Sequence, residues 1–123
     1  MKGRRFKDRL PKDRRLREFE ELVLLSVLIA TPDAYGPSLQ QILEEEAGRK
    51  ASLGAIYTAL ERLARKGLVL SELGDPTPVR GGRRKRHYEL TPEGLERVHE
   101  TRRIRERMWE KAAQGLLGEE AAK

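Results

Sequence analysis

In this 123-residue chain, the residues that most clearly suit a chemical role are a dense group of cations around two glycines. The stretch Arg80–Arg86 holds five Lys and Arg residues and no carboxylate. Like charges this close repel one another, whereas a stable hairpin favours opposite charges across its strands. The stretch is therefore typical of a turn that contacts phosphates or enters a narrow, electronegative minor groove. We expect these contacts from Arg80, Arg83, Arg84 and Lys85.

A second block of positive charge lies at the start of the chain. Met1–Arg17 contains nine basic and two acidic residues, which gives it a net charge of +7. The whole chain has a net charge of only +6. The excess of positive charge is therefore concentrated in this segment and in Arg80–Arg86. Such blocks often form arms that contact nucleic acid, although a solubilising tail has the same composition. The sequence leaves both interpretations of this arm open.

No pattern of residues predicts catalysis or a metal site. The chain has no cysteine, which excludes a disulfide, a thiolate metal site and a cysteine nucleophile. The two histidines, His87 and His99, do not have the spacing of metal ligands. The run Glu44–Glu46 is typical of a solvated helix surface. We therefore expect a protein that is not an enzyme and has no cofactor and no metal.

The length and the distribution of apolar residues indicate one soluble domain. The longest strongly apolar run, Leu22–Ala30, has nine residues and is too short to span a bilayer. The highly charged start of the chain does not resemble a secretory signal. We expect a cytoplasmic protein with no membrane partner.

Hydrophobic periodicity and turn residues predict the order helix, helix, turn, helix, hairpin, long helix. The predicted helices are Arg15–Ala30, Gly36–Ala47, Leu53–Lys66 and Pro92 to about Leu117, and the predicted strands are Leu68–Leu73 and Arg86–Leu90. Apolar residues surround the second half of the first helix, so we expect it to be buried on most sides. This order is the layout of a winged helix-turn-helix with an added terminal helix, a mainly α fold with a small β-hairpin.

This layout divides the chain into four parts. They are a basic arm over residues 1–15, a winged helix-turn-helix DNA-binding domain over 16–91, a C-terminal dimerisation helix over 92–117 and a tail over 118–123. The last helix has two partial apolar patches, which suit packing on the first helix and on a second copy of the chain. We therefore expect a homodimer, with contacts from Leu95, Val98, Met108, Trp109 and Leu116.

The third predicted helix has two contrasting sides on a helical wheel. Its core stripe is expected to contain Leu53, Ile56, Leu60, Leu63 and Ala64. The other side is small, hydroxylated and basic, which suits close approach to base edges and phosphates in a major groove. The residues expected to make these contacts are Ser52, Gly54, Tyr57, Thr58 and Arg62. Many solvated helices carry similar residues, so it is the place of this helix between a Gly-containing turn and the basic hairpin that favours DNA.

Four motifs of the chain resemble the PadR-like transcriptional regulators. They are SLGAIYTALERL at Ser52–Leu63, KGLV at Lys66–Val69, GRRK at Gly82–Lys85 and YELTPEG at Tyr88–Gly94. Tyr35-Gly36 resembles the turn between the first two helices of that family, although the family commonly has His-Gly there. The resemblance covers roughly Phe19–Trp109 and is closest to the short-tailed branch, which has a single C-terminal helix.

The resemblance implies a homodimeric DNA-binding repressor without catalytic activity. The helix 53–66 would lie in the major groove and the wing around 80–86 on the minor groove. Some short-tailed relatives bind flat aromatic compounds at the dimer interface, a role that Trp109 and Met108 could fill, although simple packing of Trp109 is the more common outcome. The alternative function is a non-specific architectural DNA-binding or RNA-binding basic module. Six aromatic residues are few for stacking on single-stranded RNA.

Overall fold

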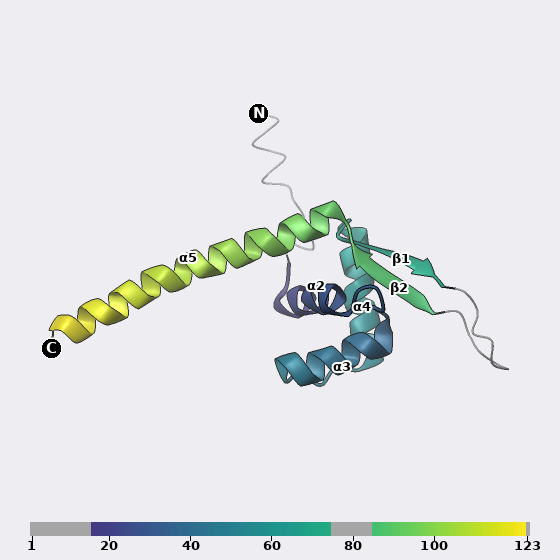
Figure 1. The fold of residues 1–123 in the computed structure, drawn as a ribbon, viewed down its shortest axis with the longest axis horizontal. Coiled ribbons are helices and arrows are strands. Elements are labelled where there is room, and N and C mark those ends of the chain that lie inside the picture. Colours follow the sequence, from purple (N-terminus) through teal and green to yellow (C-terminus); the bar gives the residue numbers. More distant parts are fainter. Residues whose placement is uncertain (1–15, 75–84, 123) are drawn as a thin grey trace, which may run out of the picture.

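The computed structural model describes residues 16–74 and 85–122. Its elements in chain order are α2 (Glu18–Ala30), α3 (Gly36–Ala47), α4 (Leu53–Arg65), β1 (Val69–Leu73), β2 (Arg86–Leu90) and α5 (Pro92–Ala122) (Figure 1). The prediction of a mainly helical fold with a two-stranded hairpin and a long last helix is confirmed. The largest difference lies at the end of α5, which continues to Ala122 instead of ending near Leu117. Residues 119–122 are Glu and Ala, which favour continuation of a helix.

Helices α2, α3 and α4 pack together around one hydrophobic core (Figure 1). Each helix turns one face inward because its apolar residues recur every three or four positions. The large apolar side chains that are fully buried are Val23, Leu24, Val27, Leu39, Leu43, Ile56, Leu60, Leu63 and Leu68. This core holds α4 by one side and leaves its other side open to solvent.

Two details of the predicted core are wrong. The second half of α2 is not buried on most sides, because Leu25, Leu28 and Ile29 are exposed. Helices α3 and α4 cover only one side of α2, and these residues lie outside that contact. On α4, Leu53 and Ala64 are also exposed, and the small side chain that enters the core is Ala59.

The hairpin is attached to the helix-turn-helix at its base. Strands β1 and β2 are antiparallel, with Val69 opposite Leu90 at the end nearest the helices. The backbone N–H of Tyr88 donates to the carbonyl oxygen of Ala34 at 2.8 Å. Ala34 is buried between α2 and α3, so β2 is fixed to the turn that joins these helices.

The start of α5 is fastened to the corner between α4 and β1. The Thr91 hydroxyl donates to the carbonyl oxygen of Gly67 at 2.7 Å and accepts from the backbone N–H of Gly94 at 2.9 Å. The backbone N–H of Thr91 donates to the carbonyl oxygen of Leu68 at 3.0 Å. Gly94 packs so closely on Leu68 that an added Cβ would overlap its carbonyl oxygen. The Thr-Pro-Glu-Gly motif is therefore a joint that sets the direction of α5.

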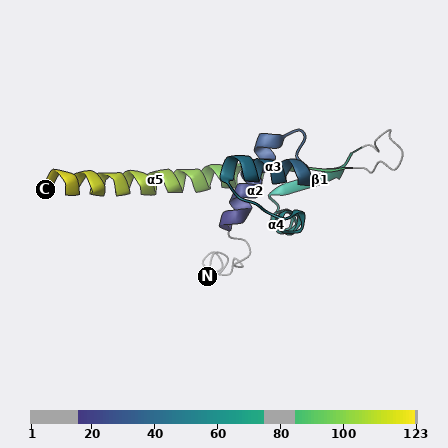
Figure 2. The same cartoon turned by 90° about the horizontal axis from the view of Figure 1, so that it is seen from below.

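Most of α5 extends beyond the rest of the molecule, as Figures 1 and 2 show. The side chains of residues 102–118 are all exposed. One polar contact reaches back to the body, where the guanidinium of Arg105 donates to the Glu21 carboxylate at 2.9 Å. Among the described residues, no helix is both long and apolar enough to cross a bilayer.

Candidate nucleic-acid interface

Helix α4 begins at a serine that caps it. The Ser52 hydroxyl oxygen accepts the backbone N–H of Ala55 at 3.0 Å, which is the N-cap role expected of this residue type. The oxygen acts as acceptor in this bond, so the hydroxyl hydrogen is left to donate outward. A Cβ at Gly54, two residues further on, would make only one ordinary contact, with the Ser52 hydroxyl oxygen at 3.9 Å. The first turn of α4 thus presents backbone and a hydroxyl group at the surface with little side-chain bulk.

Tyr57 lies across the helix-turn-helix, from α4 to the start of α3. Its ring and hydroxyl occupy the space that a side chain at position 36 would fill, so a larger residue there would force Tyr57 to move. Gly36 is buried, whereas Tyr57 is exposed over 42% of its surface. The pairing accounts for the small residue at position 36 in the turn. It also holds Tyr57 at the edge of the outward face of α4.

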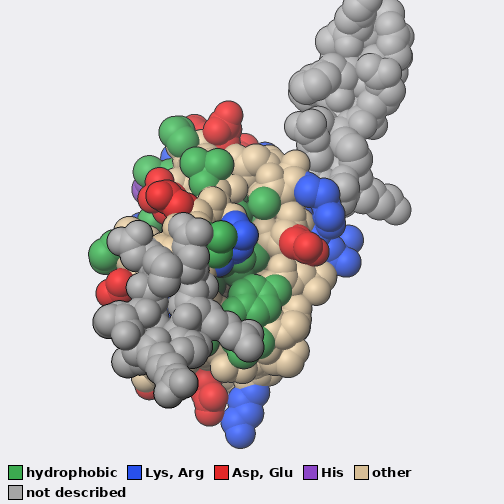
Figure 3. Space-filling view, turned by 90° about the vertical axis from the view of Figure 1, so that its right-hand side faces the viewer, with side chains coloured by type: hydrophobic (Ala, Val, Ile, Leu, Met, Phe, Trp, Pro, Cys, Tyr) green, Lys and Arg blue, Asp and Glu red, His purple; other side chains and the backbone are tan. Residues whose placement is uncertain are grey.

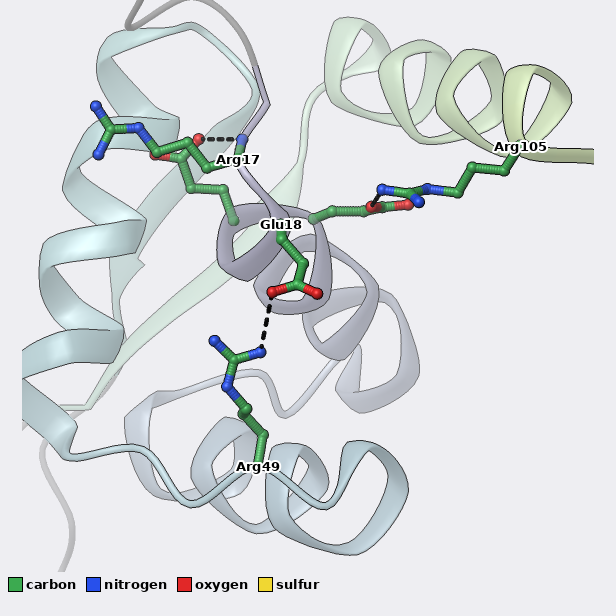
Figure 4. Close-up of polar contacts among 6 residues, drawn as sticks. Arg17, Glu18, Arg49 and Arg105 are labelled. Carbon is green, nitrogen blue, oxygen red and sulfur yellow. Dashed lines mark hydrogen bonds and ion pairs between the residues drawn. The ribbon is translucent and has the colours of Figure 1, made fainter. Parts of the chain in front are cut away.

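The outward face of α4 continues into a groove beside the start of α2. The groove has a volume of about 340 Å³. Its lining residues, which define the α2–α4 groove, are Arg17, Phe19, Glu20, Ala55, Thr58, Ala59 and Arg62. Figure 4 shows the Arg17 side chain lying alongside α4. Two of the predicted DNA contacts, Thr58 and Arg62, therefore share a surface with the N-terminal end of α2.

A buried ion pair fixes this arrangement. The Lys66 ammonium group contacts Glu20 Oε1 at 2.5 Å, and the side chains are only 5% and 3% exposed. The same carboxylate oxygen accepts the backbone N–H of Arg17 at 3.1 Å. The sequence alone does not indicate this pair, because Glu in the first turn of a helix is usually a surface residue. The available signal was the position of Glu20 three residues after Arg17, which is the spacing of a carboxylate that reaches back to cap a helix.

The base of the wing packs on an aromatic residue of the helix-turn-helix. The Lys85 ammonium group lies 4.5 Å from the centre of the Tyr35 ring. The His87 ring lies 5.8 Å from the same ring, tilted by 52°. Tyr35 thus fills the place where the resemblance leads one to expect histidine. The other predicted wing contacts, Arg80, Arg83 and Arg84, lie outside the described residues.

Basic side chains lie at several places on this end of the molecule, with acidic side chains among them. Figure 3 views it from the hairpin side and shows Lys and Arg side chains gathered at one edge, with hydrophobic side chains near them. On β2, Arg86 donates to the Ser71 hydroxyl across the hairpin at 2.9 Å. Burial raises the pKa of the Tyr88 hydroxyl above its ordinary value, although the nearby Arg86 charge partly opposes the shift. Tyr88 therefore stays neutral at physiological pH.

The predicted dimer residues are divided between two environments. Leu95, Met108, Trp109 and Leu116 are exposed, and Trp109 is exposed over 71% of its surface. Val98 instead packs into the core of its own chain, because the first turns of α5 contact α2 and β2. Met108 and Trp109 line a shallow groove of about 350 Å³ together with Ile104, Thr101 and Arg105. The binding of an aromatic effector in it stays a prediction.

Comparison with protein families decides the identity of the fold. The model of the family described as "Transcriptional regulator PadR-like family" matches residues 24–100 of the chain. The chain belongs to the PadR-like family. Members of this family are DNA-binding regulators of transcription, so membership confirms the prediction that the chain is not an enzyme. In the described ranges, no group of three His, Cys, Asp or Glu residues could hold a metal ion.

Several solved structures with this fold are of PadR-like proteins. A PadR-like transcription factor from Bacteroides fragilis is 25% identical, with a TM-score of 0.65 over 78% of this chain and 87% of that one. A PadR family regulator from Clostridium difficile R20291 is 27% identical, with a TM-score of 0.59 over 80% and 98%. Bacillus subtilis PadR, solved with operator DNA, is 19% identical, with a TM-score of 0.56 over 70% and 47%. No curated protein matched the chain.

Proposed function

We propose that this PadR-like regulator is a homodimeric, sequence-specific repressor. In this proposal α4 lies in the major groove and the wing around residues 80–86 contacts the minor groove. The observation that carries the proposal is the exposed face of α4, where Ser52, Gly54 and Thr58 point away from the core. The operator DNA in the Bacillus subtilis PadR structure supports the choice of double-stranded DNA as partner. The family resemblance favours repression of transcription over activation.

The test of this proposal is binding to a labelled duplex from upstream of the chain's own gene, beside a scrambled duplex, over a series of salt concentrations. A specific regulator should prefer the upstream duplex by roughly 10³-fold or more and should show a steep salt dependence. A steep dependence without preference would instead support an architectural binder. Stronger competition by RNA than by DNA of equal length would favour the RNA-binding alternative.

Arg62 is the α4 residue expected to contribute most to base recognition. It lies half-buried in the α2–α4 groove, which restricts its motion and supports a defined contact. Arg62→Ala should reduce the preference for the specific duplex by about 1–3 kcal/mol if the guanidinium pairs with a base. The measurement is the ratio of Kd values for specific and scrambled duplexes. Arg103→Ala, an exposed arginine of α5, is the matched control and should leave the ratio unchanged. An equal loss on both duplexes would assign Arg62 to a phosphate.

Two exposed apolar surfaces support the homodimer. One is on α2, where Leu28 and Ile29 are 40% and 60% exposed. The other is on α5, where Leu95, Trp109, Leu116 and Leu117 lie toward one side of the helix and Ile104 and Met108 lie toward another. A projecting helix with this much apolar surface gains stability when a second copy covers it. A dimer would also present two copies of α4 to successive major grooves, about 34–36 Å apart.

Trp109→Asp should therefore weaken the dimer. Placing a carboxylate where the second copy would cover Trp109 should cost at least about 2 kcal/mol, roughly a 30-fold rise in the dissociation constant of the dimer. Sedimentation equilibrium over a range of protein concentrations measures this change. Gln114→Asp is the control, because it introduces the same charge at an exposed position about 140° around the helix from Trp109. A chain that is monomeric at micromolar concentration before any substitution would contradict the dimer.

A further inference from the structure

The chain enters the described structure beside the outward face of α4. Arg17 is exposed and lines the α2–α4 groove together with Thr58 and Arg62. Figure 4 shows α2 starting next to α4, with Arg105 and the rest of α5 on the other side of α2. The segment that precedes Arg17 is therefore attached near the proposed recognition helix and away from the projecting end of α5.

The buried carboxylate of Glu20 fixes this point of attachment. It accepts the backbone N–H of Arg17 and binds the Lys66 ammonium group at 2.5 Å. Lys66 directly follows α4, so this contact ties the first turn of α2 to the end of α4. Both side chains are almost fully buried, and salt screens a buried pair much less than an exposed one. The arm before Arg17 thus has an origin that is fixed relative to α4.

The charge of the arm matches a polyanion at this position. Residues 1–15 contain eight basic and two acidic residues, which gives a net charge of +6. Arg17 and Arg62 add positive charge beside the origin of the arm. Cations gathered in this way repel one another unless negative charge lies among them. A DNA duplex supplies about one negative charge per 1.7 Å of its axis.

We propose that the basic arm, residues 1–15, contacts backbone phosphates that flank the major-groove site of α4. This inference rests on the proposed function, because α4 must be on DNA for the arm to reach it. Fifteen extended residues span at most about 50 Å, enough to follow the backbone beyond the site of α4. Phosphates are the same in every sequence, so the arm adds affinity without preference. It lies outside the family match, which begins at residue 24.

The first test locates the arm on DNA with the full-length chain. The chain has no cysteine, so Gly3→Cys provides a single attachment point for an iron chelate that cleaves nearby DNA. We expect strand cleavage in the flank of the bound duplex, next to the region that the protein protects. Gly118→Cys, at an exposed position late in α5, is the control and should not cleave that flank. Absence of cleavage from position 3 on a protected duplex would overturn the proposal, as would equal cleavage from both positions.

The second test measures the number of phosphate contacts. Replacing Arg4, Arg5 and Lys7 with Gln should make the slope of log K against log salt less steep by up to about 2.7, or 0.9 per lost contact. The control replaces Arg103, Arg107 and Lys111 with Gln, which removes the same charge from one exposed stripe of α5. Equal slopes for the arm variant and the control would overturn the arm contact while leaving the proposed function intact. Failure of the unsubstituted chain to bind any duplex would instead contradict the proposed function itself.

Discussion

Glu20→Ala should lower the free energy of unfolding by about 3–5 kcal/mol, because it leaves the Lys66 charge buried without its carboxylate. The substitution also removes the acceptor of the Arg17 backbone N–H at the start of α2. Chemical denaturation at fixed protein concentration measures the loss, since the stability of a dimer depends on concentration. The midpoint should fall with little change in slope.

A matched control for Glu20 lies in the same turn of α2. Glu18 pairs with Arg49 at 3.4 Å, but these side chains are 76% and 42% exposed. Exposed pairs contribute about 0–1 kcal/mol, so Glu18→Ala should have a small effect. The double variant Glu20→Met/Lys66→Met should recover much of the loss, because apolar side chains of similar volume can replace a buried pair. A loss for Glu20→Ala as small as that for Glu18→Ala would show that the pair does not stabilise the fold.

Gly94→Ala should destabilise the protein by about 1–3 kcal/mol, although alanine favours a helix over glycine. The added Cβ would overlap the carbonyl oxygen of Leu68, a backbone atom that cannot rotate away. Gly115→Ala is the control in the same helix, where an added Cβ meets nothing within 4 Å. It should stabilise α5 by up to about 1 kcal/mol. The thermal unfolding midpoints of the two variants measure these effects. A Gly94→Ala variant more stable than the unsubstituted chain would refute the close contact of α5 with Leu68.

Local patterns in the sequence predicted the order and the type of every described element. Periodicity identified the helices, and glycines and prolines marked the turns between them, since both signals act over a few residues. The N-cap contact of Ser52 is equally local, because its hydroxyl accepts the backbone N–H of Ala55 three residues further on. The approach of Gly94 to Leu68 was not predicted, because it depends on how α5 meets the corner between α4 and β1.

The sequence did not reveal which partner each apolar or charged residue would find. Glu20 and Lys66 are 46 positions apart, and nothing local marks either as buried. Leu25, Leu28 and Ile29 resemble core residues in the sequence, but they lie on the side of α2 that α3 and α4 leave open. Periodicity reports an apolar face, and it does not tell whether the same chain or a second copy covers that face. Val98 shows the opposite case, because a residue expected at a dimer contact lies in the chain's own core.

The Thr91 joint has a mechanical consequence for a dimer held together through α5. The 31 residues of this helix extend about 46 Å, so the helix acts as a lever whose pivot is the corner between α4 and β1. A tilt of about 5° at the pivot would displace the far end by roughly 4 Å, a large part of one helical turn of 5.4 Å. In such a dimer, the distance between the two α4 helices would depend on the angle at this one joint. A molecule that alters the crossing angle of two α5 helices would therefore change the separation of both α4 helices. The new separation would either match or no longer match the spacing of successive major grooves.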